Sequence, residues 1–409
     1  MTDRSPTASD LPLPLAGIRV LDLATFVAAP FAATVLGEFG ADVIKIEHPS
    51  GGDSMRRFGT PSASDGRTFA WLSEARNKQS VTLDLKTEDD AAVFKELVRR
   101  SDVVAENFRP GTLEKWGLGP DVLLALNPAL VILRVSGYGQ TGPYKNRPGF
   151  ARIAHAVGGL SYLAGEYGGP PVTPGSTTLA DYVSGMYGAI GVLLALRTAQ
   201  QTGQGQVIDV ALYESIFRVL DELAPVYAAH GTVREREGVS TRNACPHGHF
   251  PCADGNWVAI ACTSDKMWER MAVNVLNQPE LAETYPTTAS RLADRAVVDG
   301  AVEAFTRANA MADVVRLCTD GDVPCGPINS IADIFADPHF AARETLTTIT
   351  DVDPAVGAVT VPAVLPRLSA TPGRITHLGP VLGDWNEAVR DLIADVGQIR
   401  SRTQTPDDE

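Results

Sequence analysis

Asp181 stands at the start of a predicted helix, and glycine recurs at every third position just after it, at Gly185, Gly188 and Gly191. Its carboxylate is ionised at neutral pH and needs no base to attack a carbonyl carbon. Taken alone, an aspartate at this place is an N-cap, which stabilises its helix by about 1 kcal/mol. Each glycine disfavours a helix by up to about 1 kcal/mol relative to alanine. We therefore expect a long helix from Asp181 to about Gln200, with a glycine face that another backbone or a ligand approaches closely.

A glycine-rich loop at Gly137–Gly142 fits the spacing of a dinucleotide-binding fingerprint and follows a predicted strand. That fingerprint binds a pyrophosphate only where a helix begins in the loop, because the amides of the helix N-terminus hold the phosphates. Here Pro143 and Pro148 flank a charged loop, and no strand ending in an acid follows at the expected distance. The pattern predicts a tight loop near some other ligand and argues against a nicotinamide cofactor.

Basic side chains are scattered through the N-terminal half, and several follow directly after predicted strands. They are Lys45, His48, Arg56, Arg57, Arg76, Lys78, Arg109, Lys115, Lys145 and Arg147. Ligands of parallel sheets bind at the carboxyl ends of the strands. Most of these cations are expected to be ordinary solvated residues. A subset that converges on one site would let a strongly acidic protein hold an anionic, phosphate-rich ligand.

Cys245, His247, His249 and Cys252 form a compact group of possible metal ligands. Structural zinc sites usually pair their ligands about two to four residues apart in each arm, and this spacing matches no such pattern. Buried cysteines commonly act as small hydrophobic residues. We therefore expect no metal site, and the role of this cluster stays open.

The first third of the chain alternates short β-branched runs with helical stretches. The runs that predict strands are Ile18–Leu23, Val43–Glu47, Ser80–Leu85, Asp102–Glu106 and Leu130–Val135, with a later one at Gln206–Leu212. Pro30–Phe39 and Glu88–Arg100 predict helices between them, and Thr87 with Asp90 predicts an N-terminal cap on the second. This alternation predicts an α/β fold with a mostly parallel sheet covered on both faces.

The pattern of the sequence changes at about Glu222, and all five cysteines lie beyond that point. We predict a large domain over residues 1–221, a smaller α+β domain over 222–334, and a return to the large domain over 335–409. In the smaller domain, Trp257–Ala261 predicts a strand and Cys325–Pro327 a turn. Helices are predicted at Lys266–Asn277, Val297–Ala308 and Asp313–Asp320, and a last one at Trp385–Val396.

The composition excludes several classes of protein. Of 409 residues, 44% are hydrophobic and 21% charged, which is typical of a globular protein with enough chain to bury a core. The formal net charge is −14, from 35 basic and 49 acidic side chains, which argues against binding nucleic acid or an anionic membrane surface. The longest strongly apolar run, Met186–Leu196, is shorter than the roughly 20 residues that cross a bilayer. The odd count of five cysteines and the polar N-terminus predict a cytoplasmic protein without a signal peptide.

Short motifs follow one another in order over nearly the whole chain. They are Leu15–Leu23, Leu36–Glu47, Asn77–Ser80, Leu83–Lys86, Glu106–Gly111, Ser136–Pro143, Thr202–Gln206 and Leu378–Gly383. Together these motifs resemble the class III CoA-transferases, the family of formyl-CoA transferase, carnitine CoA-transferase and the α-methylacyl-CoA racemases.

This resemblance implies a subunit with a Rossmann-like large domain and a smaller domain, two of which interlock as an obligate homodimer. It implies that the aspartate of Leu179–Asp181, after a Leu/small pair at a helix start, is the catalytic nucleophile. Asp181 would take the acyl group of an acyl-CoA as an anhydride, then carry coenzyme A as a thioester, and pass it to a second carboxylic acid. Coenzyme A is then part of the substrate, and no tightly bound cofactor is expected. The family's glycine-rich lid in the small domain has no Gly-Gly counterpart here, only Gly248 and Gly255.

The resemblance also implies which residues contact the substrate. Coenzyme A contacts would come from Lys45, His48, Leu72, Arg76, Lys78, Asn107, Phe108 and Lys115, with Tyr138 near the acyl end. Val27 stands where formyl-CoA transferase has an oxalate-contacting glutamine, and His48 stands where it has an arginine, so oxalate is not the expected acceptor. Arg147 and Arg152, beside the glycine-rich loop, are expected to meet a second carboxylate bidentately. This predicts a dicarboxylic acceptor or a succinyl donor.

Other activities stay open at this stage. The racemases of the family use a histidine together with the aspartate, but Phe150 stands in the matching stretch, and His155 on a predicted helix fits a core position. An intramolecular shift of coenzyme A within one dicarboxylate would use the same Asp181. A catalytically silent CoA-binding protein and a nicotinamide oxidoreductase complete the alternatives. Asp181 in its motif argues against the first, and the prolines after Gly142 argue against the second.

Overall fold

The computed structural model describes residues 11–62, 66–175, 177–354 and 356–393, and these form two compact units. The first unit takes in the described residues up to 160, those of 175–224 and those from 344 onward. The second takes in residues 161–174 and the described residues of 225–343. It differs from the predicted smaller domain, 222–334, at both ends and by including the segment 161–174.

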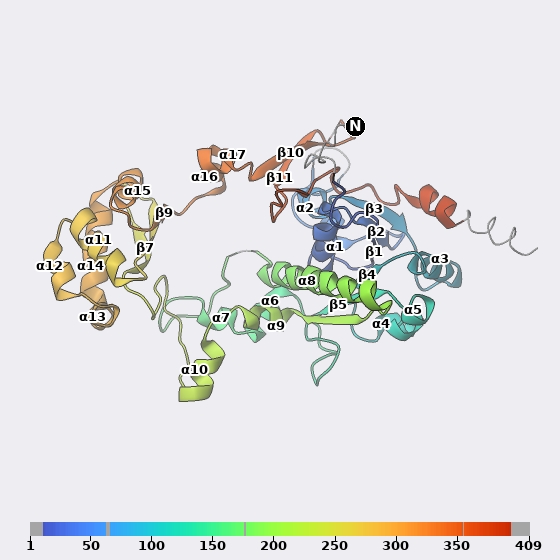
Figure 1. Cartoon of the computed structure of the whole chain (residues 1–409), viewed down its shortest axis with the longest axis horizontal. Helices are drawn as coiled ribbons and strands as arrows, with labels where there is room; N and C mark the ends of the chain where they lie inside the picture. Colours follow the sequence, from blue (N-terminus) through green and yellow to red (C-terminus); the bar gives the residue numbers. More distant parts are fainter. Residues whose placement is uncertain (1–10, 63–65, 176, 355, 394–409) are drawn as a thin grey trace, which may run out of the picture. The chain divides into compact units, whose positions relative to one another are not determined.

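A sheet of six parallel strands forms the centre of the first unit (Figure 1). In chain order the strands are β1 (Arg19–Asp22), β2 (Asp42–Glu47), β3 (Lys78–Thr82), β4 (Val103–Glu106), β5 (Val131–Ser136) and β6 (Val207–Ala211). They lie in the order β3-β2-β1-β4-β5-β6, and every neighbouring pair is parallel. This is the strand order of a doubly wound, Rossmann-like sheet, so the predicted parallel sheet is confirmed.

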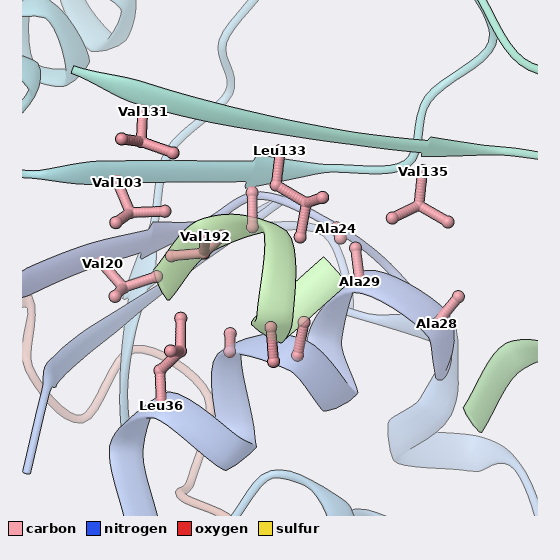
Figure 2. Packing of buried hydrophobic residues seen from close by; sticks show 14 of the residues in the cluster. Val20, Ala24, Ala28, Ala29, Leu36, Val103, Val131, Leu133, Val135 and Val192 are labelled. Carbon is pink, nitrogen blue, oxygen red and sulfur yellow. The ribbon is translucent and has the colours of Figure 1, made fainter. Parts of the chain in front are cut away.

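Both faces of this sheet are buried over the four strands β1, β2, β4 and β5, whereas the edge strand β6 is partly exposed. Successive side chains of a strand point to opposite faces. Val103 of β4 belongs to one hydrophobic cluster, while its neighbour Val104 belongs to another. Figure 2 shows the first cluster, which the sheet forms with α1 (Ala28–Glu38) and α8 (Leu179–Thr202). The second cluster includes the buried side chains of α3 (Glu88–Val98). Strands covered on both faces explain why these runs are almost continuously apolar.

The other helices of the first unit are short. They are the 3-10 turn η1 (Ser54–Arg57), α2 (Phe69–Glu74), α4 (Thr112–Lys115), α5 (Pro120–Leu126), α6 (Ala151–Val157) and α9 (Leu212–Arg218). Two more, α7 (Leu160–Leu163) and α10 (Leu223–His230), lie where the chain passes between units. The predicted cap on α3 is confirmed, since Thr87 accepts the amide of Asp90.

The last part of the first unit begins with an antiparallel pair of strands, β10 (Leu346–Thr350) and β11 (Ala358–Pro362). Residues 386–393 are helical, within the range predicted at Trp385–Val396. The end of that predicted helix, 394–396, lies outside the described residues.

Helix α8 begins at Leu179, so Asp181 lies inside its first turn and Thr178 is the N-cap residue. The interpretation of Asp181 as an N-cap is therefore wrong. The expected close approach to the glycine face of α8 is confirmed, and the approaching group is the backbone of α1. A Cβ added at Gly185 would lie 2.6 Å from the carbonyl oxygen of Ala28. Glycine is needed there because no side chain fits between the two helices.

Helix α8 is long and apolar enough to cross a membrane by length and composition, although the apolar run seen in the sequence was too short. Half of its most apolar window is buried inside the protein. The same length and composition describe the core helix of a globular unit, and α1 packs along it (Figure 1). On its outer side, Met186, Ile190 and Leu194 are 48%, 52% and 66% exposed.

A three-stranded antiparallel sheet lies in the second unit, with the order β7-β8-β9. Its strands are β7 (His247–Pro251), β8 (Trp257–Ala261) and β9 (Cys325–Pro327). The helical elements are α11 (Asp265–Arg270), the π-helical η2 (Met271–Val275), α12 (Pro279–Thr284), α13 (Thr288–Ala293), α14 (Arg295–Ala308), α15 (Met311–Asp320), α16 (Ile331–Ala336) and α17 (Pro338–Ala342).

The turn predicted at Cys325–Pro327 is wrong, because these residues form β9 and pair with β8. Pro327 lies opposite Val258 in that pair. The strand is at the edge of the sheet, where proline is tolerated because no further strand needs its missing amide.

Candidate active site

A cavity of about 210 Å³ lies in the first unit at the carboxyl ends of β1, β4 and β5. Residues 25–28 line it after β1, residues 107–110 after β4, and residues 136–137 at the end of β5. The strands β2 and β3 lie on one side of β1, and β4 lies on the other, so the strand order reverses here. Ligands of doubly wound sheets bind at this point. Asp181, from the first turn of α8, completes the lining.

Asp181 is the only carboxylate among the described residues that line this cavity. Burial raises the pKa of Asp181 to about 6, and a hydrogen bond with the Thr178 side chain opposes that rise. The rise has the direction expected for a carboxylate that is taken out of water and not paired with a cation. At neutral pH the group is therefore ionised but poorly hydrated, a state that favours nucleophilic attack.

Three cations line the same cavity: Arg109, Lys145 and Arg147. The guanidinium of Arg147 stacks 3.6 Å from the centre of the Tyr144 ring. The whole chain carries a formal net charge of −14, so this local excess of positive charge is what an anionic ligand needs. The expectation that some of the scattered cations converge on one site is confirmed for these three.

The loop between β1 and α1 forms one wall of the cavity and is held by two side chains. Phe26 has a φ of 62°, a left-handed conformation that is unusual for a bulky residue. Its amide donates to Asp53 at 3.0 Å. Asn107 accepts from the amide of Thr25 at 2.8 Å and donates to its carbonyl at 2.7 Å. Strain of this kind persists where neighbouring groups fix the backbone, so Asp53 and Asn107 set the position of this wall.

A second cavity, of about 170 Å³, lies next to the first at the carboxyl ends of β1, β2 and β3. Lys45, His48 and Phe108, three of the predicted coenzyme A contacts, line it. The Nε2 atom of His48 lies 3.5 Å from a carboxylate oxygen of Asp84. Phe108 lines both cavities, so one extended ligand along this edge of the sheet would reach both.

Beneath the second cavity lies a buried network of charges. Lys78 pairs with Asp22 at 2.8 Å, and Lys45 lies 3.5 Å from the same carboxylate. Lys45 also pairs with Asp53 at 3.1 Å and donates to the carbonyl of Ala24. Burial alone would raise the pKa of Asp22, but the two ammonium groups outweigh it and hold that pKa below its ordinary value. The network therefore fixes the end of β1 from within the protein.

The structure brings together only part of the predicted substrate contacts. The first cavity is lined by Val27, Asn107, Phe108, Arg147 and Asp181. Three predicted contacts are buried elsewhere. Leu72 lies in a hydrophobic cluster with Leu378, and Lys78 is in its ion pair with Asp22. The Nε atom of Arg76 donates to Glu38 at 2.7 Å. Outside the described lining of both cavities are Lys115, Tyr138 and Arg152.

The glycine-rich loop after β5 contains no helix, because residues 137–150 are irregular and α6 begins at Ala151. Two of its backbone segments pack against each other, and a Cβ added at Gly137 would lie 2.9 Å from the Cα of Gly149. The amide of Gln140 donates to Asp209 at 2.9 Å. The predicted tight loop is confirmed, and no helix begins in it; its place beside a ligand stays a prediction.

Cys245 and Cys252 belong to the hydrophobic core of the second unit. Burial and the nearby Asp299 carboxylate raise the pKa of Cys245 to about 12. His249, on β7, is exposed. Over the ranges that the structure describes, no group of three or more His, Cys, Asp or Glu side chains is arranged to hold a metal ion.

His155 is buried on α6, and its Nε2 accepts the amide of Ala180 at 3.0 Å. None of the described residues that line the first cavity is a histidine. Phe150, which stands where the racemases have their histidine, lines that cavity instead. The core position predicted for His155 is confirmed. Its contact with the residue before Asp181 carried no signal in the sequence, because the two residues lie in different helices.

Comparisons with known proteins find matches over nearly the whole chain. The model of CoA-transferase family III matches residues 15–386. The succinyl-CoA–L-malate CoA-transferase alpha subunit of Chloroflexus aurantiacus is 53% identical over 405 residues, covering 97% of this chain and 94% of that protein. The beta subunit from the same species is 58% identical over 380 residues, covering 92% and 93%. A solved CAIB/BAIF family protein from Brucella suis aligns with a TM-score of 0.81 at 34% identity, covering 94% of this chain and 100% of that one.

Proposed function

The chain belongs to CoA-transferase family III, and on that premise we propose that it moves coenzyme A from succinyl-CoA to a dicarboxylic acid through covalent intermediates on Asp181. The observation that carries this proposal is that Asp181, a partly buried carboxylate, shares a cavity with three cations. Two similar proteins are named succinyl-CoA–L-malate CoA-transferase subunits. L-malate is therefore the first acceptor to test.

In the first half of the reaction, a carboxylate oxygen of Asp181 attacks the thioester carbonyl carbon of the donor. The carbon–sulfur bond breaks, coenzyme A leaves as a thiolate, and the acyl group is joined to Asp181 as a mixed anhydride. The thiolate then attacks the side-chain carbonyl carbon of Asp181 and releases the donor acid as a carboxylate. Asp181 now carries coenzyme A as a thioester, so the free energy of the thioester bond is kept.

The second half runs the same steps in reverse with another acid. The acceptor carboxylate attacks the aspartyl thioester, which releases the thiolate and forms a second anhydride. The thiolate attacks the acceptor's carbonyl carbon, giving the new acyl-CoA and the free Asp181 carboxylate. Water would hydrolyse each intermediate, so the site must exclude it during the cycle. The burial that raises the pKa of Asp181 supports such exclusion.

Arg147 and Lys145 both line the cavity that holds Asp181. Their positive charges support the proposal that the substrate carries a second carboxylate. A guanidinium binds a carboxylate bidentately. Hydrogen bonds to charged groups contribute about 1.5–3 kcal/mol, so Arg147→Ala should raise the KM of a dicarboxylic acceptor roughly 10- to 100-fold while sparing monocarboxylic acceptors. Arg152→Ala is the comparison, since Arg152 is exposed and outside the lining. An effect at Arg152 instead of Arg147 would contradict this assignment.

The covalent route is tested by trapping its intermediate. Enzyme is mixed with succinyl-CoA in the absence of acceptor and quenched with hydroxylamine, which converts an anhydride or a thioester into a hydroxamate. Peptide mass spectrometry should find the hydroxamate at residue 181 in the wild type and in Asp121→Asn, a variant at an exposed carboxylate of α5. Asp181→Asn should show none. Turnover without an adduct at residue 181 would overturn the proposal.

The two acids are identified by incubating the enzyme with a panel of acyl-CoA donors and free carboxylic acids and following exchange by mass spectrometry. Isotopically labelled free acid enters the acyl-CoA pool when coenzyme A passes between two acids. No label enters if coenzyme A only shifts between the two carboxyl groups of one dicarboxylate. The second result would replace the intermolecular proposal with the intramolecular one.

We also propose that the active form is an interlocked homodimer. The outer side of α8 exposes Met186, Ile190 and Leu194 in adjoining turns, and apolar patches of this kind mark protein contacts. The similar proteins are named as alpha and beta subunits, which supports an assembly of more than one chain but not the identity of its two chains. Leu194→Glu should shift the mass measured by light scattering from dimer to monomer. A wild-type enzyme that is monomeric and active would contradict this assembly.

A further inference from the structure

The first turn of α8 carries backbone amides that its own helix cannot satisfy, as at every helix N-terminus. Thr178, the N-cap residue, makes no side-chain cap. Its carbonyl accepts the amide of Asp181 at 2.9 Å. The amide of Ala180, directly before the proposed nucleophile, donates outside the helix instead.

His155 supplies the partner of that amide from α6. Its Nε2 accepts the Ala180 N–H at 3.0 Å, across 25 residues of sequence. The imidazole is 1% exposed and Ala180 is fully buried. A buried amide left without an acceptor is unfavourable, because water cannot replace the missing bond. The contact therefore ties α6 directly to the turn that carries Asp181.

This contact requires a neutral imidazole, because Nε2 must offer its lone pair to the amide. The ring proton then sits on Nδ1, which is buried and has no hydrogen-bond partner among the described residues. Burial and the Arg152 guanidinium both lower the pKa of His155 and so favour the neutral form at neutral pH.

The elements packed against α6 are α8 and α9. Their ionisable residues are Asp181, Tyr182, Tyr187, Arg197, Tyr213, Glu214 and Arg218. The charged group that shifts the pKa of His155 is Arg152, on α6 itself. An acid pH that protonates the ring would remove the acceptor and add a buried charge beside the start of α8.

We propose that His155 is a positioning residue for Asp181: its neutral ring holds the Ala180 amide and fixes the turn that presents the nucleophile to the cavity. The inference rests on the proposed role of Asp181. It assigns His155 a task other than proton transfer at the substrate, since its lone pair is engaged and the residue does not line the cavity. Misplacing a reacting group by about 1 Å typically slows a reaction about 100-fold, so loosening this turn has a measurable effect.

Two substitutions of His155 distinguish the loss of its hydrogen-bond acceptor from the loss of its volume. Glutamine offers an oxygen acceptor that cannot become cationic, whereas leucine fills the site without an acceptor. His155→Leu should lower kcat and the single-turnover rate of adduct formation at residue 181 by about 10- to 100-fold, with the KM for succinyl-CoA within about 3-fold. His155→Gln should recover most of that loss. Circular dichroism and thermal unfolding establish that both variants fold.

The pH profile provides a readout that a merely structural role would not change. In the wild type, acid protonates both Asp181 and His155, so the acid side of the kcat profile should fall more steeply than one proton allows. In His155→Gln the fall should follow one proton. A one-proton fall in both enzymes would overturn the proposal.

The remaining outcomes also decide the question. A folded His155→Leu with wild-type kcat and labelling rate overturns the role of His155, and so does a His155→Gln no better than His155→Leu. If His155→Leu does not fold, His155→Gln decides alone: full kcat supports the proposal and a large loss overturns it. Absence of any adduct at residue 181 in the wild type would overturn the proposed function itself. Equal labelling of the wild type and His155→Leu is a different result, and it would overturn only the role of His155.

Discussion

Two aspartates of the first unit, the fully buried Asp22 and the partly buried Asp181, have opposite surroundings. Asp22 ends β1 between the ammonium groups of Lys45 and Lys78, and these hold its pKa below the ordinary value in spite of burial. Burial raises the pKa of Asp181 to about 6, and the only opposing influence in the described structure is a hydrogen bond with Thr178. The paired carboxylate of Asp22 stabilises the end of β1, and its charge is engaged by the two ammonium groups. The unpaired carboxylate of Asp181 opposes folding, but its charge stays available for the proposed attack.

The largest effect that this comparison predicts is on the rate. Asp181→Asn keeps the size of the side chain and its polar contact with Thr178 but removes the proposed nucleophile. Because loss of a nucleophile typically lowers kcat by about 10⁴-fold or more, exchange between succinyl-CoA and labelled acid should become undetectable in routine assays. Binding of coenzyme A, measured by calorimetry, should persist. Activity within tenfold of the wild type would mean that another group accepts the acyl chain.

The second prediction breaks the paired site instead. Lys78→Met replaces the ammonium with an apolar chain and leaves Asp22 with Lys45 alone. Removing one partner of a buried pair costs about 3–5 kcal/mol, so the free energy of unfolding in urea should fall by that amount. Arg99→Ala, at the exposed pair with Glu96 on α3, is the control and should cost less than about 0.5 kcal/mol. Equal effects of the two variants would show that the buried network does not stabilise the fold.

The third prediction is that removing the charge of Asp181 stabilises the protein. Below about pH 4, Asp181 is protonated in the folded and the unfolded chain and makes no difference to stability. Between there and pH 6 the unfolded chain releases its proton first, so stability falls as pH rises; above a pKa of about 6 the whole penalty is present. Asp181→Asn should therefore raise the free energy of unfolding by about 1–3 kcal/mol at roughly pH 7.5, and by much less near pH 4.

Urea unfolding at the two pH values measures this effect. An equal gain at both pH values would contradict the assignment, because it would have to come from packing or hydrogen bonding instead of charge. The two variants are expected to change the free energy of unfolding in opposite directions: Asp181→Asn should raise it and Lys78→Met should lower it. This difference is the strongest test of the comparison. Asp181→Asn removes an unpaired charge from a partly buried position, whereas Lys78→Met leaves the buried carboxylates Asp22 and Asp53 with Lys45 as their one remaining ammonium partner in the network.

Much of the first unit could be predicted from the sequence, because its strands are nearly continuous apolar runs and its helices have periodic apolar faces. The resemblance to the family implied site roles for Asn107 and Asp181, Arg147 was expected to meet a carboxylate because it lies beside the glycine-rich loop, and the structure brings all three to one cavity. In a parallel sheet such positions meet at one edge, so residues far apart in the chain become neighbours once the sheet is known.

The cations could not be assigned in the same way. Lys78 and Arg76 were predicted to meet coenzyme A, but Lys78 pairs with Asp22 and Arg76 with Glu38. Whether a cation meets a ligand or a carboxylate depends on which strands and helices are neighbours, and residue types alone do not show that.

Two features of the site depend on geometry that has no signature in residue types. The left-handed backbone of Phe26 is held by the hydrogen bond that its amide donates to Asp53 and by the two hydrogen bonds between Asn107 and the backbone of Thr25. The contact of His155 with the first turn of α8 joins separate helices. Neither a backbone torsion nor the facing of two helices follows from a single sequence without the packing that creates it.

The smallest predicted effect concerns pH and separates the two aspartates within one experiment. In the proposed mechanism Asp181 attacks only when ionised, so kcat/KM should fall below a pKa of about 6 and reach roughly a tenth of its plateau near pH 5. Asp22, whose pKa is held low, stays ionised over this range and leaves the frame intact. The measurement uses succinyl-CoA well below its KM, at constant ionic strength, in the His155→Gln background so that one carboxylate titrates. A midpoint near pH 4 would mean that Asp181 is as well hydrated in the working enzyme as a surface carboxylate. Burial would then not be what distinguishes it, and its reactivity would have to come from the substrate's own position.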